Sequence, residues 1–275
     1  AAEEAAAKAK KAAEQKAEAA KAKADDPPLL NLAKAKAAEE VKAAEEEKAA
    51  AAAAKAAMDV SKAKKEDKAE ETHIDASIIK IKPYGVLGYG SQNLKDDKKN
   101  LPKNMAFVDP AGLIFIKDGP MGAKGASGQI YNYLFGKGSW PKQFHEEVRS
   151  SIQKTGDAKA HYYEKKEVTC IHVVGPDFRS LNLTFEQAVV SLSAAYVSVF
   201  TEFSTTSENT LRLLPISGGI YAWNFKNRMA ELSRKAIDSA FTQLSNKILK
   251  KIASRDIHMC IYMQEEVKTF EEAFK

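Results

Sequence analysis

Two glycine-rich segments hold the residues whose types and spacing are best suited to bind a ligand. One is DGPMGAKGASGQIY, residues 118–131, and the other is RLLPISGGIYAWN, residues 212–224. Glycine adopts positive φ angles and permits close approach, so several backbone N–H groups can point at one anion. A helix that begins nearby adds its own free N–H groups and partial positive charge. The chemistry that these segments favour is therefore the binding of a phosphate or a diphosphate.

Neither segment matches a complete nucleotide-binding signature. The Gly-Lys-Ser/Thr sequence of a P-loop follows neither of them, and residues 118–131 have no acidic residue at the spacing of the dinucleotide-binding fingerprint. Two interpretations therefore stay open for each segment, a tight turn and a phosphate cradle. The presence of two such segments in one chain favours phosphate binding more than either segment would alone.

Other side chains with chemical potential are scattered along the sequence. Cys170 and Cys260 lie within apolar runs, which indicates buried free thiols and a reducing compartment rather than a disulfide or a metal pair. His172 lies in the middle of an apolar run, and we expect a structural role for it. His145 and His161 show no metal-ligand spacing with each other or with a cysteine. The sequence contains no complete catalytic constellation.

The elements that must position the two segments follow from the pattern of apolar residues. From residue 78 onward, short apolar runs alternate with helical patterns, which predicts an α/β domain whose mixed sheet is covered on both faces. We expect strands at 78–82, 104–108, 113–117, 168–174, 210–216 and 257–263. We expect helices at 125–135, 141–154, 184–203, 227–252 and 265–274.

Both glycine-rich segments then lie between a strand and a helix. In open α/β sheets ligands bind beyond the carboxyl ends of the strands, in loops of this kind. The ends of the expected strands 104–108 and 210–216 should therefore face one cleft, with both glycine-rich segments at its edge.

Residues 1–73 differ in composition from the rest of the chain. They contain 29 Ala, 15 Lys and 16 acidic residues, and neither glycine nor an aromatic residue. Alanine, lysine and glutamate are strong helix formers, and Pro27 and Pro28 interrupt the pattern. We expect an extended α-helical arm at 1–73, followed by the folded domain at 74–275. Because the arm is polar almost all round, it is either a solvated extension or a segment that docks on a partner.

Charge and targeting features limit the classes of partner. The chain has a formal net charge of +5, but residues 1–73 are almost neutral, which argues against a simple nucleic-acid-binding tail. The basic residues of the helix expected at 227–252 could contact an acidic partner or RNA, but a solvated helix face is the usual explanation of such residues. Because the sequence has neither a run of about 18 apolar residues nor a secretory segment, we expect no membrane partner and an intracellular, cytoplasmic location. A ciliary, nuclear or mitochondrial assembly stays open.

The order of segments in residues 74–275 resembles that of the macro domain, a family of ADP-ribose-binding modules. Six segments carry the resemblance: FVDPAG (107–112), GASGQIY (125–131), GDAK (156–159), CIHVVGP (170–176), ISGGIYAWN (216–224) and IHMCIYMQEEVKTFEEAF (257–274). Each segment is a weak signal alone, but their common order and spacing are specific. The resemblance implies a divergent member with a three-layer α/β/α fold. It also implies ADP-ribose, or ADP-ribosylated protein, as the ligand, without a cofactor or a metal.

The resemblance also implies which residues contact the ligand. In macro domains the loop that corresponds to 216–224 wraps the diphosphate with backbone N–H groups, and the aromatic residue after the isoleucine faces the ribose. The loop at 125–128 would close over the other side of the diphosphate. The implied ligand-binding residues are Asp109, Gly112, Gly125, Ala126, Ser127, Gly128, Ser217, Gly218, Gly219, Ile220 and Tyr221.

Departures from the family pattern argue against catalysis. Hydrolytic macro domains carry an asparagine where this chain has Gly112, and an aspartate where it has Ser127. Neither residue can replace the group that positions or activates a water molecule. The aspartate that reads adenine in the family has no match in residues 81–90, although Tyr84 or Tyr89 could stack on a base.

These features predict a non-catalytic module that binds ADP-ribose or a related nucleotide diphosphate through glycine-rich loops. The alternative is a structural subunit of a large assembly, such as a ribosome, an axonemal microtubule or a chromatin-like complex. In that case residues 1–73 would dock a degenerate macro domain. An ADP-ribosyl hydrolase ranks third among these interpretations, because the two side chains that would catalyse hydrolysis are replaced in this chain.

Overall fold

The computed structural model describes residues 72–90 and 102–275. The arm expected at 1–73 therefore lies outside the described residues, apart from its last two positions.

Helices and strands alternate along the described chain. The helices are α3 (Leu113–Asp118), α4 (Gly125–Phe135), α5 (Glu146–Ser151), α6 (Phe185–Thr205), α7 (Met229–Gln243), α8 (Asn246–Ala253) and α9 (Gln264–Ala273). The strands are β1 (Lys80–Lys82), β2 (Ala106–Pro110), β3 (Ala158–Tyr163), β4 (Val168–Val173), β5 (Thr210–Leu213) and β6 (Asp256–Cys260). Short 3-10 segments occur at η1 (Ala76–Ile78), η3 (Glu164–Lys166) and η4 (Trp223–Arg228).

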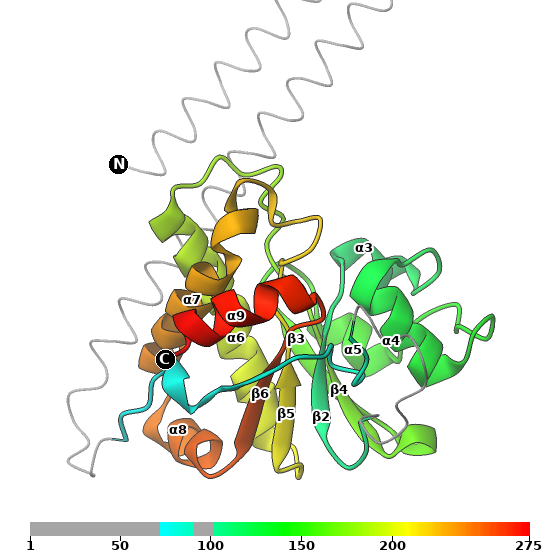
Figure 1. Ribbon diagram of the computed structural model, residues 1–275. Coiled ribbons are helices and arrows are strands. Elements are labelled where there is room, and N and C mark those ends of the chain that lie inside the picture. The colour runs from blue at the N-terminus through cyan, green and yellow to red at the C-terminus, as the bar shows by residue number, and fades with distance from the viewer. Residues whose placement is uncertain (1–71, 91–101) are drawn as a thin grey trace, which may run out of the picture. The chain divides into compact units, whose positions relative to one another are not determined.

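The described strands form one mixed sheet in the order β1-β6-β5-β2-β4-β3. Neighbouring strands are parallel, except that β3 runs antiparallel to β4 at one edge. Figure 1 shows β2 in the middle of the sheet, between β5 and β4. Because β1, β6, β5 and β2 run in one direction, their carboxyl ends lie at the same edge of the sheet, where ligands of such folds bind.

Side chains of each strand alternate between two separate cores, one on each face of the sheet. In β2, Ala106 and Val108 pack with residues of α6, α7, α8 and α9, whereas Phe107 packs with residues of α3, α4 and α5. The same alternation in β4 sends Ile171 to the first core and Cys170 to the second. This period of two is the signature of a strand buried on both faces. The expected three-layer α/β/α fold with a mixed sheet is therefore confirmed.

α6 is the 21-residue helix that covers the centre of the first face. Thr184 begins it with a capping box, in which the Thr184 side chain accepts from the Gln187 N–H and the Gln187 side chain accepts from the Thr184 N–H. Among the described helices, α6 is the one with the length and apolar composition of a membrane span. Half of that span is buried inside the protein. Its packing against α7 and the sheet is that of a core helix.

The strand expected at 113–117 is wrong, because these residues form α3. Only Ala111 and Gly112 separate this segment from β2, and a parallel neighbour would need a crossover of a dozen residues or more. Both positions beside β2 are already taken by β4 and β5. The apolar run therefore satisfies its backbone hydrogen bonds within a helix and buries Ile116.

Two other parts of the expected element order differ from the structure. The sequence pattern did not predict β3, which has no β-branched residue and alternates only weakly between buried and exposed positions. The single helix expected at 227–252 is two helices, α7 and α8. Leu244 adopts an extended conformation between them, and Ser245 precedes the first residue of α8. Serine is favoured at that position because it disfavours helix interiors and suits helix starts.

The first described residues are joined to α7 and α8. The Thr72 N–H donates to Asn246 Oδ1 at 3.0 Å, and the Ala76 N–H donates to Asp238 Oδ1 at 2.7 Å. Ala76 is fully buried in the first core. The domain therefore includes residues that precede β1.

Candidate functional site

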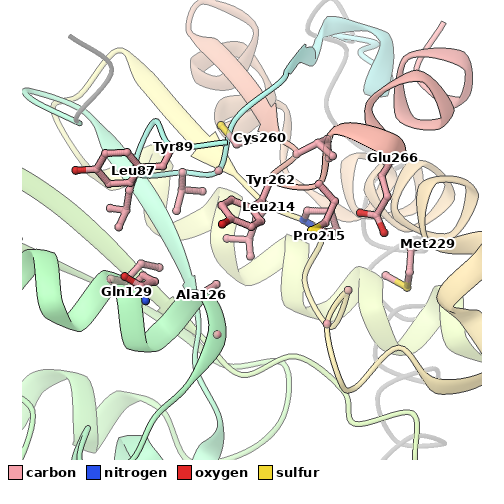
Figure 2. Close-up of a pocket in the computed structure, with 18 of the residues that line it drawn as sticks. Leu87, Tyr89, Ala126, Gln129, Leu214, Pro215, Met229, Cys260, Tyr262 and Glu266 are labelled. Atoms are coloured by element: carbon pink, nitrogen blue, oxygen red, sulfur yellow. The ribbon is translucent and has the colours of Figure 1, made fainter. Parts of the chain in front are cut away.

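A pocket of about 480 Å³ lies at the edge of the sheet where the parallel strands end. Its wall combines loops after β1, β5 and β6 with the first turns of α4 and α9. Figure 2 shows Ala126 and Gln129 of α4 on one side, and Met229 and Glu266 on the other. The pocket is thus formed by segments that are far apart in the sequence.

The first glycine-rich segment contributes the N-terminus of α4. Gly125 has a φ angle of +61°, which an L-residue rarely adopts, and it lines the pocket together with Ala126. Lys124 precedes the helix without a side-chain hydrogen bond to the first turn within the described residues. Free N–H groups of that turn carry the partial positive charge of the helix end. Gly128 is required for packing, because a Cβ there would lie 2.7 Å from the Ala123 carbonyl oxygen.

The second glycine-rich segment forms a tight turn on the opposite wall. The Gly218 N–H donates to the Pro215 carbonyl at 2.9 Å, and a Cβ on Gly218 would lie 2.8 Å from Pro215 atoms. Ser217 has a φ angle of +62° and donates its hydroxyl to the Pro176 carbonyl at 2.7 Å. By contrast, a methyl group added to Gly219 would meet no described atom within 4 Å. The turn therefore has no room for a side chain at Gly218, whereas there is open space beside the pocket-lining Gly219.

Four of the expected site residues border one pocket. Gly125 and Ala126 come from the first segment, and Gly218 and Gly219 from the second. Both glycine-rich segments therefore border one pocket at these positions. The residues after β5 line it, whereas none of the described residues at the end of β2 does, so the expected cleft between the ends of these two strands is found only in part. The N–H group of Gly218 differs from the expected role, since it serves the turn itself.

The other expected residues lie away from the pocket wall. Ser127 is buried and donates its hydroxyl to the Pro110 carbonyl at 3.3 Å. Gly112 lies beside Tyr221, because a Cβ on Gly112 would be 3.4 Å from the Tyr221 hydroxyl. The Tyr221 ring is covered by the Arg179 guanidinium at 4.7 Å. Ile220 is 73% exposed.

Asp109 belongs to a buried hydrogen-bond network rather than to the surface of the site. Its Oδ2 accepts from the Tyr131 hydroxyl at 2.8 Å and from His172 Nδ1 at 2.7 Å. His172 Nε2 in turn accepts from the Tyr163 hydroxyl at 2.9 Å. Burial, reinforced by the charge of Asp109, raises the pKa of Tyr131 well above its ordinary value. His172 is structural, as expected, although its partners are side chains rather than the backbone.

Apolar and aromatic side chains make up most of the remaining wall, and the sequence analysis missed most of them. Leu87 and Tyr89 come from the loop after β1, and Ile261, Tyr262 and Met263 come directly after β6. Of these, Tyr262 is 44% exposed. The available signal was an aromatic residue at the carboxyl end of a buried strand, in the loop that leads into a helix. Tyr89, one of the two aromatic residues that could stack on a base, lines the pocket.

Glu266 is the charged residue among those that line the pocket in the described chain. It lies in the first turn of α9 and is half-buried. Burial raises the pKa of its carboxyl group, and the neighbouring charge of Glu265 acts in the same direction, while Lys226 opposes both. A carboxylate in this position prefers a hydrogen-bond donor over an apolar neighbour.

The described residues do not gather a metal site. They contain no group of three or more His, Cys, Asp or Glu side chains placed to hold an ion. Cys170 and Cys260 are free and buried, as expected. Burial raises the pKa of the Cys260 thiol to about 12, so this pocket-lining thiol stays protonated at neutral pH.

Comparison with known proteins gives matches among solved structures. No protein-family model and no curated protein matches the chain. A macrodomain of Oceanobacillus iheyensis with ADP has 14% identity and a TM-score of 0.42, over 69% of this chain and 86% of that one. A Trypanosoma brucei macrodomain in complex with ADP has 14% identity and a TM-score of 0.48, over 73% of this chain and 71% of that one.

An alphavirus structure, P23pro-zbd, matches at 20% identity with a TM-score of 0.40. The match covers 62% of this chain but only 21% of the viral chain. The domain described here is thus similar in fold to solved macrodomains.

Proposed function

We propose that the pocket binds ADP-ribose or a related nucleotide diphosphate and that the domain does not cleave it. One observation carries the proposal: the N-terminus of α4 and the 215–219 turn border one pocket whose remaining wall is mostly apolar and aromatic. Such a pocket offers an anion-binding end and a base-binding end to a single ligand.

The anion-binding end is argued from the backbone. The first turn of α4 presents free N–H groups and a positive helix end, which attract a diphosphate. Gly219 lies across the pocket with no described atom within 4 Å of an added methyl group, so a phosphate can approach its backbone closely. Gly125 serves the same purpose on the helix side, because its φ of +61° suits glycine.

The base-binding end is argued from the side chains. Tyr89 and Tyr262 provide aromatic faces, and Leu87, Leu214 and Phe270 provide apolar surface. Aromatic rings stack on any nucleobase, because every base has a π face. A volume of about 480 Å³ lies within the range of natural small-molecule sites.

The chemistry of the wall supports binding without hydrolysis. At the anion-binding end the residues are Gly125, Ala126, Gly218 and Gly219, which carry no acid or base. Ser127 is buried and engaged with a carbonyl, and Asp109 is fully buried beneath α4 in its own network. A general acid or base must come within hydrogen-bond distance of the reacting group, and neither residue is placed to do so.

Ligand-induced thermal stabilisation tests the binding part of this proposal. A ligand that binds only the folded state raises the free energy of unfolding by RT ln(1 + L/Kd), where L is the free ligand concentration. We expect ADP-ribose to raise the melting temperature more than adenosine or pyrophosphate does, because only ADP-ribose fills both ends of the pocket. Equal shifts with ADP-ribose and with ribose 5-phosphate would contradict a two-ended site.

Turnover tests the second part of the proposal. Incubation with mono-ADP-ribosylated protein should release no more ADP-ribose than the buffer alone does. General acid–base catalysis is typically worth a factor of about 10² to 10⁴, so real activity would be obvious above that background. Release that grows in proportion to enzyme concentration would contradict the proposal.

A further inference from the structure

The described wall of the pocket ends at the two glycine-rich segments. The first turn of α4 lines one side of this end, and Gly218 and Gly219 line the other. Tyr221 lies two residues after Gly219 and is not among the described residues that line the pocket. The same holds for Gly112, which precedes α3. A group attached beyond the second phosphate of a ligand must therefore lie past this end, where the chain continues to Tyr221.

Side chains of the protein itself fill the space beside Gly112. A Cβ added to Gly112 would lie 3.4 Å from the Tyr221 hydroxyl and 3.2 Å from the Phe115 ring. Even a methyl group would therefore be crowded at this position, because packed side chains give way only slightly. The two aromatic side chains thus occupy the place that a ligand group would need beside Gly112.

Arg179 covers one face of the Tyr221 ring. Its guanidinium lies 4.7 Å from the ring centroid, within the range of a cation–π contact. Asp177 fixes the guanidinium, because Arg179 Nε donates to Asp177 Oδ1 at 2.9 Å and Arg179 Nη2 donates to Asp177 Oδ2 at 2.6 Å. A sugar could pack on this ring face only by displacing the guanidinium.

The loop that carries Arg179 is joined to the segment that carries Tyr221. The Ser217 hydroxyl donates to the Pro176 carbonyl at 2.7 Å. The Phe178 N–H donates to the Tyr221 carbonyl at 3.1 Å. Ser217 is also buried, so water does not compete for its hydrogen bond. The packing of the protein itself thus places Arg179 over Tyr221.

We propose that the pocket recognises only the nucleoside diphosphate part of its ligand, and that Arg179 keeps a sugar beyond the second phosphate away from Tyr221. This inference rests on the proposed function, because it concerns the same pocket. The ligand class is then nucleoside 5′-diphosphates with any group, or none, on the second phosphate. Tyr221 serves packing, in contrast to the ribose contact that the resemblance to macro domains implies.

Three ligands measure the contribution of each part. The full chain is titrated calorimetrically with AMP, with ADP methylated on its second phosphate, and with ADP-ribose. The last two carry the same charge, and only ADP-ribose has a sugar beyond the second phosphate. We expect their dissociation constants to agree within about threefold. AMP lacks the second phosphate and should bind about tenfold to a hundredfold more weakly, because hydrogen bonds to a charged group are lost.

Arg179→Ala tests whether the guanidinium excludes the sugar. The variant uncovers the Tyr221 ring, on which the sugar of ADP-ribose can then pack. We expect ADP-ribose to bind at least about fivefold more tightly than methylated ADP, which corresponds to burial of about 40 Å² of apolar surface. Loss of the positive charge affects both ligands alike and cancels in the ratio. Because an exposed ion pair contributes little to stability, the variant should fold.

Arg228→Ala is the matched control. Arg228 is exposed, its guanidinium lies 3.6 Å from the Phe185 ring centroid, and it pairs with Glu231. It does not line the pocket. The control thus removes the same charge and the same kind of ring contact, and it should keep the wild-type ratio.

The outcomes separate this inference from the proposed function. Wild-type protein that binds ADP-ribose more than about threefold more tightly than methylated ADP overturns the inference, while the proposed function stands. An unchanged ratio in Arg179→Ala overturns the role of Arg179. Failure to bind either diphosphate, or binding of AMP equal to theirs, overturns the proposed function and this inference with it. A ratio near one that rises only in Arg179→Ala supports both.

Discussion

At the scale of single residues, a side chain expected to contact a ligand belongs instead to the packed interior. Asp109 lies at the position of a ligand-contacting residue in the resemblance, yet its carboxylate is fully buried and accepts hydrogen bonds from Tyr131 and His172. Tyr131 belongs to α4, the helix that borders the pocket. The network therefore holds α4 against β2 and β4, and its effect on binding is indirect.

Substitution of Asp109 should cost stability before it costs affinity. Asp109→Ala leaves the Tyr131 hydroxyl and the His172 N–H buried without an acceptor, and each unsatisfied donor costs about 1–3 kcal/mol. We expect the free energy of unfolding to fall by about 2–6 kcal/mol in a denaturant titration. Asp177→Ala is the control, since it removes a more exposed carboxylate that pairs with Arg179, worth about 1 kcal/mol or less. An equal decrease in the free energy of unfolding in the two variants would show that the buried network stabilises the fold no more than the Asp177–Arg179 pair does.

His258 should make the fold sensitive to mild acid. Desolvation and the positive charges of Lys82, Arg212 and Lys80 lower its pKa to about 4, against the attraction of Asp256. The unfolded chain binds a proton at about 6.5, whereas the folded protein does so only near 4. The unfolded state therefore takes up more protons in this window, and stability falls as the pH drops from 6.5 to 4.

Melting curves across this pH window test the role of His258. His258→Gln cannot titrate, so its stability should depend less on pH between 6.5 and 4 than that of the wild type. An unchanged slope in His258→Gln would assign the acid sensitivity to other groups.

At the scale of elements, periodicity predicted most strands and helices, and local connectivity explains the main error. The strands at 168–174 and 257–263 are found as β4 and β6 with shifted ends, because their apolar runs are buried in the sheet. The run at 113–117 has the same composition, but both positions beside β2 are occupied, by β4 and β5. Composition alone does not reveal which positions in a sheet are already occupied.

Only the glycine positions of the candidate site could be predicted from the sequence. Gly125, Gly218 and Gly219 are recognisable by residue type, because few other residues adopt such backbone conformations or leave so much room for a ligand. Tyr262 and Glu266 carry no such mark, since an aromatic residue after a strand and an acidic residue in a first helical turn are common. Their place on the pocket wall becomes evident only in the folded protein, where the end of β6 and the start of α9 border the same pocket as the N-terminus of α4.

The two adjacent glycines of the 215–219 turn should respond differently to the same substitution. A Cβ on Gly218 would lie 2.8 Å from Pro215, so Gly218→Ala must distort the turn and should lower the melting temperature. A Cβ on Gly219 would meet no described atom within 4 Å, so Gly219→Ala should leave the melting temperature unchanged. Thermal unfolding of both variants checks the contrast. A larger loss for Gly219→Ala would contradict the turn geometry.

At the scale of the whole molecule, the first described residues are part of the folded domain. Ala76 and Ile79 are buried in the core, and the Ala76 N–H is bonded to Asp238. The domain boundary expected at 74 stays a prediction, as does the role of residues 1–73 in recruitment to a larger assembly. Co-purification of the chain with and without that segment from cell extract would measure the recruitment.

Truncation at two points should separate the arm from the core. A chain that begins at Thr72 keeps the hydrogen bonds to α7 and α8, so its melting temperature should match that of the full chain. A chain that begins at Lys80 loses Ala76 and Ile79 from the core and should melt about 5 °C lower or more. A large loss already in the first truncation would show that residues 1–71 contribute to the core.

Calorimetric titration of the full chain with ADP-ribose tests the central claim most directly. We expect saturable binding to one site per chain in the wild-type protein. We expect an affinity at least about tenfold weaker in Gly219→Val, whose side chain would project where the diphosphate must approach. The matched variant Ile220→Ala keeps its backbone N–H and loses only a side chain that is 73% exposed, so it should bind as the wild type does. Absence of saturable binding in the wild type, or equal binding in Gly219→Val, would contradict the account.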